Sequence, residues 1–312
     1  MVTAGLERQI GSASIWNPAS GWGLLANRDP ARPLALAILR LHKPPARIES
    51  GRVILAGSDI LQLDREALRR MRWKEMSFIP QGAMNSLNPV MRIRHQIADA
   101  IRAHAPAWSG AQIRRRIEEL LERVGLAKQV ADLYPHELSG GMKQRVCIAL
   151  AIVLEPKLIV ADEPTSALDV VVQRIVMETL KDVQKQINAA MIVIGHDMGL
   201  MAQSVDRLAV FYAGRMVDTA PVRDFFRQPL HPYSQALITS LPSLKERKPL
   251  TGIPGMQPPL FDLPSGCPFH PRCSLAEARC KVTAPDLSVL APQRSVACHI
   301  IKERINDQHQ ST

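Results

Sequence analysis

The stretch Leu158-Ile159-Val160-Ala161-Asp162-Glu163 decides the fold of this protein. Its continuous apolar run suits a strand that is buried on both faces, as the strands of parallel sheets are. A helical pattern over residues 168–187 separates this run from a second one, Met191-Ile192-Val193-Ile194. A strand, a helix of roughly 20 residues and another strand form a βαβ unit. The sequence therefore predicts an α/β protein with a mainly parallel sheet.

Two adjacent carboxylates, Asp162 and Glu163, end the first of these strands. Open α/β sheets bind their ligands at the carboxyl ends of the strands, which places both side chains at a candidate site. Asp162 suits a magnesium ion because hard cations prefer carboxylate oxygens. Glu163 suits the orientation or deprotonation of an attacking water. For an isolated Asp-Glu pair, a strand end with solvated charges is the commoner alternative.

Further motifs surround the carboxylates. Leu138–Gln144 (LSGGMKQ) is a glycine-rich turn at the start of a helix, where free N–H groups and the helix dipole attract phosphate. Ser166–Asp169 follows the carboxylates, Gly195-His196-Asp197 ends the next strand, and Gln81 follows the apolar strand that stops at Pro80. Each motif is weak evidence by itself, and their order along the chain is the informative feature.

The order Gln81, LSGGMKQ, LIVADEPTSALD and His196-Asp197, at these spacings, resembles the ATP-binding cassette (ABC) ATPases. The resemblance implies a P-loop NTPase-like nucleotide-binding domain with a mainly parallel sheet and a helical subdomain, and it implies ATP and Mg²⁺ as cofactors. By the same resemblance, Asp162 acts on Mg²⁺ and Glu163 is the catalytic base. Gln81 senses metal and water and relays to a membrane partner.

The other motif residues take nucleotide-binding roles by resemblance. Ser139, Gly140 and Gly141 contact the γ-phosphate of an ATP that the opposite subunit holds. Asp169 bridges the dimer, and His196 holds the γ-phosphate as a catalytic residue. These roles imply that the chain works as a dimer of ATPase subunits.

Two short stretches and the C-terminal tail indicate which group of ABC ATPases the chain resembles. Residues 81–89 (QGAMNSLNP), residues 231–237 (HPYSQAL) and the tail from Ile253 to His299 look like segments of oligopeptide and dipeptide importers, so the resemblance covers roughly residues 34–300. It implies an ATPase that energises peptide import, with a second ABC ATPase subunit (a homodimer or heterodimer), two integral-membrane permeases and an extracytoplasmic peptide-binding protein. The chain is then peripheral, at the cytoplasmic face of the inner or plasma membrane. Nickel remains an alternative solute.

The chain divides into three parts on this interpretation. Residues 34–242 form the ABC ATPase domain, with a helical subdomain at 83–153. Residues 243–312 form a loop-rich C-terminal extension, which is rich in proline and holds four of the five cysteines. Residues 1–33 show no helical or strand period and form an aberrant N-terminal segment.

The four tail cysteines are spaced C-x5-C-x6-C-x17-C, at Cys267, Cys273, Cys280 and Cys298. Four thiolates can hold zinc or an iron–sulfur cluster, and some relatives with this pattern carry a [4Fe–4S] cluster. The alternative is four reduced thiols packed in a proline-rich domain. Cys147 follows LSGG inside a helix and is expected to be a small core residue.

The phosphate loop GxxxxGK[ST], which such ATPases need, is absent from the 312 residues. It belongs just before Leu34, where the chain instead reads Asn27-Arg28-Asp29-Pro30-Ala31-Arg32-Pro33. Pro33 has no hydroxyl for Mg²⁺, and the planar guanidinium of Arg32 is not the point charge that a lysine supplies. A catalytically degenerate partner subunit is therefore an alternative function.

We interpret this absence as a shift of the reading frame, caused either by a sequencing error in a functional gene or by a real frameshift that leaves a damaged product. Residues 27–33 can be encoded as aat cgg gat ccg gca aga cc, and with a preceding g the same bases regroup as gaa tcg gga tcc ggc aag acc, which reads ESGSGKT. Extending the same shift upstream through Gly11 to Ala26 permits LSIDLEPGVGLGAFG, whose last glycine completes the motif. Codon degeneracy permits many such readings, but this one yields the missing motif at the required position. We expect residues 1–33 to be an out-of-frame reading, with the normal frame resuming at about Leu34.

Composition and charge restrict the other functions that the chain could have. The net charge of +10 is compatible with nucleic acid or an anionic membrane surface, whereas an aromatic content of 4% argues against a base-stacking RNA binder. A soluble ABC ATPase of DNA repair or translation is a third alternative, but residues 81–89 and 231–237 argue against it. We therefore expect no nucleic-acid partner. Five cysteines are too few for a disulfide scaffold, and Glu7 and Arg8 interrupt any signal peptide.

Overall fold

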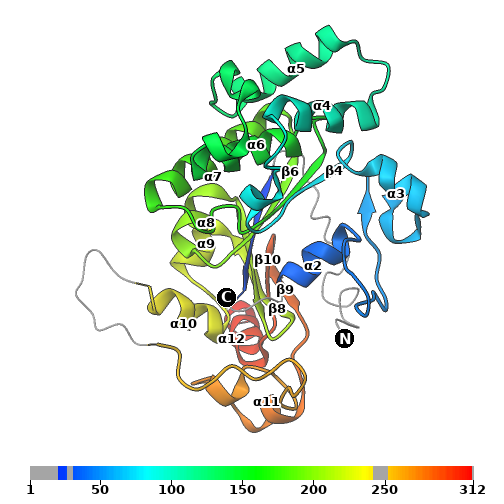
Figure 1. The fold of residues 1–312 in the computed structure, drawn as a ribbon. Helices are drawn as coiled ribbons and strands as arrows, with labels where there is room; N and C mark the ends of the chain where they lie inside the picture. The colour runs from blue at the N-terminus through cyan, green and yellow to red at the C-terminus, as the bar shows by residue number, and fades with distance from the viewer. Residues whose placement is uncertain (1–19, 27–30, 242–251, 311–312) are drawn as a thin grey trace.

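The computed structural model describes residues 20–26, 31–241 and 252–310 (Figure 1). The described residues form an eight-stranded sheet in the order β4-β5-β6-β1-β7-β8-β10-β9 and a short separate hairpin, β2-β3. The neighbours from β4 to β7 are parallel, whereas β8, β10 and β9 add antiparallel pairs. The predicted α/β fold with a mainly parallel sheet is confirmed. In sheet order the strands are Met76–Ile79, Leu158–Asp162, Ala190–Gly195, Gly21–Ala26, Arg207–Tyr212, Arg215–Pro221, Arg294–Val296 and Ser288–Ala291.

The central strand β1 corrects the sequence analysis, which found no strand period in residues 1–33. Gly21–Ala26 pairs in parallel with β6 on one side and with β7 on the other. Pairing with two strongly apolar neighbours decides its conformation, because strand formation depends on context more than on propensity. A Cβ at Gly23 would lie 2.7 Å from Leu208 Cδ2, so a larger residue here would force that side chain to shift. The features expected at residues 1–19 and 27–30, including the site of the missing phosphate loop, lie outside the described residues.

Both faces of β5 are buried, as its apolar run predicts. Ile159 packs in a core with α6 (Gly140–Ala151) and α7 (Val170–Gln186), while Val160 packs in a second core with α2 (Ala31–Ile38). The helix expected at 168–187 is thus present as α7. In this layered arrangement the sheet lies between two apolar cores, and its edge residues are fixed by the packing on both sides.

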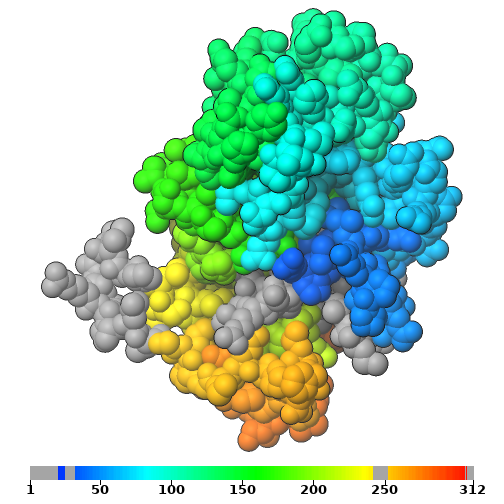
Figure 2. Space-filling model, viewed as in Figure 1, coloured from blue at the N-terminus to red at the C-terminus, as the bar shows by residue number. Residues whose placement is uncertain are grey.

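Between β4 and β5 the chain is helical and lies at one end of the molecule (Figures 1 and 2). The buried face of α5 is the one that the sequence period predicts, with Ile113, Ile117, Leu120 and Leu121 in the core. The elements here are η2 (Ala83–Ser86), α4 (Ile93–His104), α5 (Gly110–Arg123), η3 (Lys128–Asp132), η4 (Pro135–Glu137) and α6.

The remaining elements of the ATPase region are smaller. β2 (Ile54–Leu55), β3 (Ser58–Asp59), η1 (Ile60–Gln62) and α3 (Arg65–Met71) precede β4, and α8 (Met198–Ser204) and α9 (Val222–Arg227) flank β7 and β8. Asp64 caps α3 by accepting from Ala67 N through its side chain. No helix in the described part of the chain is long and apolar enough to cross a membrane.

The C-terminal residues close the opposite end of the molecule (Figure 1). They continue the large sheet, because β10 pairs with β8. Tyr212 of β7 contacts the rings of Tyr233 and Phe269, with centroids 4.7 and 5.1 Å away, and all three side chains are buried. This aromatic cluster joins the extension to the ATPase region. The elements are α10 (Pro232–Thr239), η5 (His270–Arg272), α11 (Ala278–Val282), β9, β10 and α12 (His299–Gln310).

Tyr212→Ala is expected to lower the free energy of unfolding by about 3–5 kcal/mol, because it leaves a cavity between two buried rings. Tyr212→Phe keeps the ring and loses only a 3.4 Å contact from Arg272, so its effect is expected to stay below about 1.5 kcal/mol. Urea unfolding followed by circular dichroism measures both values. Equal effects of the two substitutions would contradict the packing role.

Candidate functional site

The two predicted carboxylates lie at the carboxyl end of β5. Asp162 is the last residue of the strand and is only 2% exposed. Glu163 follows with φ of 45°, in the left-handed region that residues other than glycine seldom adopt. Its backbone N–H donates to Ile194 O at 2.9 Å, which ties this turn to β6. The chain thus holds Glu163 in a fixed, uncommon backbone conformation directly after the sheet.

Glu163 accepts contacts on both carboxylate oxygens. Gln81 Nε2 donates to Oε2 at 2.7 Å, and His196 Nδ1 lies 3.1 Å from Oε1. Gln81 follows β4 and His196 follows β6, the two parallel neighbours of β5. The sheet therefore brings together Gln81, Asp162, Glu163 and His196, which the sequence places far apart. A carboxylate held in this way can orient and deprotonate a water molecule.

Arg32 of α2 joins the same group, and sequence reasoning missed this contact. Its Nε lies 3.2 Å from Asp162 Oδ2, and its Nη1 donates to Gln81 Oε1 at 2.9 Å. From the sequence, Arg32 is only a poor substitute for a phosphate-loop lysine. A long cationic side chain in the first turn of a helix is the only signal that could have pointed to Asp162.

The residues expected to meet a partner's nucleotide form a second group. Ser139 caps α6 by accepting from Met142 N at 3.3 Å, and Asp169 caps α7 by accepting from Val172 N at 3.0 Å. A Cβ at Gly141 would lie 2.5 Å from Val172 Cγ1, so the starts of these two helices are in close contact. A Cβ at Gly140 would lie 3.3 Å from Leu168 Cδ2, a tight contact without overlap. The hydrogen bonds around Glu163 do not include this group.

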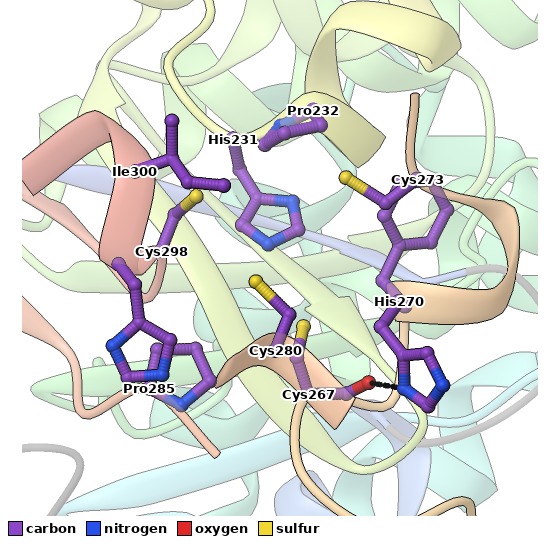
Figure 3. A pocket seen from close by; sticks show the side chains of 11 residues that line it. His231, Pro232, Cys267, His270, Cys273, Cys280, Pro285, Cys298 and Ile300 are labelled. Atoms are coloured by element: carbon purple, nitrogen blue, oxygen red, sulfur yellow. Dashed lines mark hydrogen bonds between the residues drawn. The ribbon is translucent and has the colours of Figure 1, made fainter. Parts of the chain in front are cut away.

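The four tail cysteines line one small cavity of about 10 Å³. Figure 3 shows the sulfur atoms of Cys267, Cys273, Cys280 and Cys298 pointing toward a common space. Burial raises the pKa of the Cys267 thiol to about 11 and also raises the pKa of Cys273 and Cys298. All four are free thiols. Within the described residues, no three His, Cys, Asp or Glu side chains are grouped closely enough to hold a metal ion as they stand.

His231 lines the same cavity and connects it to the sheet. Its ring Nδ1 accepts from Tyr233 N at 3.0 Å and so caps α10, and its backbone N–H donates to Asp218 Oδ2 at 3.0 Å. Burial lowers the pKa of His231 to about 3, which keeps the imidazole neutral. Burial likewise raises the pKa of Asp218. The residue therefore serves as a neutral structural link at the start of the extension.

Cys147 is the buried core residue that the sequence predicts. Its thiol contacts Ala83 O at 3.2 Å, and burial raises its pKa to about 12. It therefore packs α6 against the segment that follows Gln81.

Family models match two parts of the chain. The ABC transporter model matches residues 34–166, and the model of the oligopeptide/dipeptide transporter C-terminal region matches residues 217–280. Among solved structures, a dimeric post-hydrolysis state of an ATP-binding cassette bound to ADP and Pi is similar, with a TM-score of 0.57 and 26% identity over 66% of this chain and 87% of that chain. The fold and the family match thus define an ATP-binding cassette.

Curated relatives narrow the class. The dipeptide transport ATP-binding protein DppD of Caldanaerobacter subterraneus subsp. tengcongensis is 40% identical over 269 residues, which cover 86% of this chain and 82% of the relative. DppD of Escherichia coli K12 is 39% identical over 268 residues, with 85% and 82% covered. The chain belongs to the ABC transporter ATP-binding proteins of the oligopeptide/dipeptide type.

Gly141→Ala is expected to lower the free energy of unfolding by about 1–3 kcal/mol, because the added methyl group overlaps Val172. Adding Val172→Ala removes the overlap and is expected to recover most of the loss. Gly110→Ala is the control, since nothing lies within 4 Å of a Cβ placed there. Denaturant unfolding of the four proteins measures the effect, and equal stability of Gly141→Ala and Gly110→Ala would show that α6 and α7 are not in this contact.

Proposed function

We propose that this chain descends from, and in its correct frame acts as, the ATP-binding and ATP-hydrolysing subunit that energises peptide import through an ABC transporter. The observation that carries the proposal is the grouping of Gln81, Asp162, Glu163 and His196 at the carboxyl edge of β4, β5 and β6. Glu163 is the proposed base, and Gln81 and His196 hold its two oxygens toward a water. Relatives named for dipeptide transport, matched over 86% and 85% of this chain, support peptides as the solute.

The proposed partners follow from the second group of residues. Ser139, Gly141 and Asp169 lie at the starts of α6 and α7 and take no part in the hydrogen bonds around Glu163. We assign them, with Gly140, to the nucleotide of a second ATPase subunit, which is a copy or a homologue of this chain. Two membrane permeases and an extracytoplasmic peptide-binding protein complete the proposed transporter, with this chain peripheral at the cytoplasmic face of the membrane.

With Arg32 and Pro33 in place, the residues at the carboxyl edge of β4, β5 and β6 do not fit ATP with Mg²⁺. The guanidinium of Arg32 already contacts Asp162 and Gln81, the two proposed metal-binding side chains. Pro33 offers no hydroxyl ligand, and no lysine precedes it. This mismatch favours one of two explanations: an altered reading frame in residues 1–33, or a catalytically degenerate subunit of the same transporter.

We favour the altered frame. The ABC transporter match begins at residue 34, where the frame is proposed to resume. β1 and α2 flank residues 27–30, and a strand followed by a loop and a helix is the setting of a phosphate loop. Residues 27–30 themselves lie outside the described residues. Resequencing the DNA decides between the explanations: codons 27–33 that cannot regroup into a glycine-rich GK[ST] loop would leave the degenerate subunit as the better proposal.

Replacing residues 26–33 (ANRDPARP) by GESGSGKT is expected to give ATP binding that the unaltered chain lacks, because it supplies the backbone cradle, the lysine and the hydroxyl. Titration with a fluorescent ATP analogue measures this. Adding Glu163→Gln to the replaced loop is expected to keep binding and abolish steady-state hydrolysis. Equal binding by the unaltered chain would contradict the first part, and near-normal turnover with Glu163→Gln would refute the assignment of the base.

The tail cysteines are proposed as ligands of a [4Fe–4S] cluster. Their four thiols line one cavity, and four cysteines are the usual donor set for such a cluster. Burial raises the pKa of Cys267, Cys273 and Cys298, so binding of iron requires these thiols to release their protons. The cavity of about 10 Å³ is small, and the side chains must move outward to admit a cluster. A bound cluster would supply a crosslink within the extension and a one-electron redox centre.

Anaerobically purified protein is expected to show the broad visible absorption of an iron–sulfur cluster and to contain iron and acid-labile sulfide. Cys280→Ser is expected to lose both, whereas Cys147→Ser, which alters the cysteine outside the cavity, is expected to retain them. Colourless protein with stoichiometric zinc would indicate a zinc site instead, and protein free of any metal would refute ligation.

A further inference from the structure

We propose that Arg32 is an internal cation that takes the metal-binding position beside Asp162 and excludes divalent cations from this edge. The inference rests on the proposed assignment of Asp162 to metal binding. It goes further by naming the residue of this chain that controls access to that site. It concerns the chain with the sequence as it stands, in which Arg32 is present.

Two contacts place the guanidinium. Arg32 Nε lies 3.2 Å from Asp162 Oδ2, and Arg32 Nη1 donates to Gln81 Oε1 at 2.9 Å. Both partners are oxygens, which are the ligand atoms that hard cations prefer. A single arginine therefore engages the carboxylate and the amide oxygen that the metal assignment requires.

Burial explains why a cation is held there. The Asp162 side chain is 2% exposed, and a buried carboxylate needs a paired cation or hydrogen bonds to remain ionised. The Arg32 side chain is 43% exposed, so it reaches the buried carboxylate from the surface of the molecule. This asymmetry allows the arginine to swing into solvent when the site is disturbed, while the carboxylate stays fixed in β5.

Arginine and a divalent cation cannot hold this carboxylate together. Magnesium binds oxygen at about 2.0–2.1 Å, inside the space between Asp162 and the guanidinium. The two positive charges would also repel each other at that separation. Occupancy by Arg32 and occupancy by a metal are therefore mutually exclusive.

The contact also fixes the orientation of Gln81. Its amide oxygen accepts from Arg32, while its amide nitrogen donates to Glu163 Oε2 at 2.7 Å. The amide oxygen of Gln81 thus faces the guanidinium of Arg32, and its amide nitrogen faces the carboxylate of Glu163. A metal ion in the position of the guanidinium would need the same orientation of the amide. Removal of the guanidinium leaves two oxygens, from Asp162 and Gln81, directed at one place.

Mn²⁺ binding in the absence of nucleotide, measured by electron paramagnetic resonance, tests the inference. Arg32→Ala and Arg32→Gln are each expected to bind Mn²⁺ at least about tenfold more tightly than the unaltered protein. Adding Asp162→Asn to either variant is expected to remove the gain. Arg115→Ala, which removes an exposed arginine from α5, is the control and is expected to leave Mn²⁺ binding unchanged.

Two results would overturn the inference. One is the absence of any gain in folded Arg32→Ala and Arg32→Gln proteins, with folding checked by circular dichroism. The other is a gain in Mn²⁺ binding that Asp162→Asn does not remove, because the metal would then bind away from Asp162. ATP binding after loop replacement is a separate measurement, so failure of the metal experiment and failure of the proposed function are distinguishable.

Discussion

The parallel pairing of β5 with β4 and β6 is the interaction on which the candidate site depends. Ile79 pairs with Ala161, and Asp162 pairs with Ile194, so the three strands end at the same edge. Apolar cores on both faces of the sheet hold these strands in register, because a shift would expose buried side chains. The short polar segments after the strands therefore meet at fixed positions, and the hydrogen bonds around Glu163 follow from that pairing.

Electrostatics at this edge are governed by the burial of Asp162. A carboxylate inside a packed sheet end is costly unless a positive charge or hydrogen bonds compensate it, and that requirement exists whatever residue supplies the cation. In a chain with a phosphate loop, a bound Mg²⁺ would supply that positive charge. In the chain as it stands, Arg32 has the reach and the charge to meet the same requirement. The need to compensate the buried charge of Asp162 thus links the absence of the phosphate loop to the contact between Arg32 and Asp162.

The C-terminal extension is attached by a different kind of chemistry. Strand pairing between β10 and β8 continues the sheet, and the rings of Tyr212, Tyr233 and Phe269 fill the junction. The neutral ring of buried His231 caps α10 on one side and borders the thiol cavity on the other. The cavity is therefore part of a rigid junction with the ATPase region, so a change in the bonding of its thiols would act on packed side chains.

The sequence by itself predicted β5 and α7, because an apolar period is a local property of the chain. The order of its motifs supplied the candidate site residues and indicated that a phosphate loop is expected before Leu34, where the chain has none. Only the tertiary structure decided that Gly21–Ala26 forms the central strand, that Arg32 reaches Asp162 and that the four tail cysteines share a cavity. These features depend on contacts between segments that are distant in the chain. Such contacts produce no periodicity or motif spacing in the sequence from which they could be predicted.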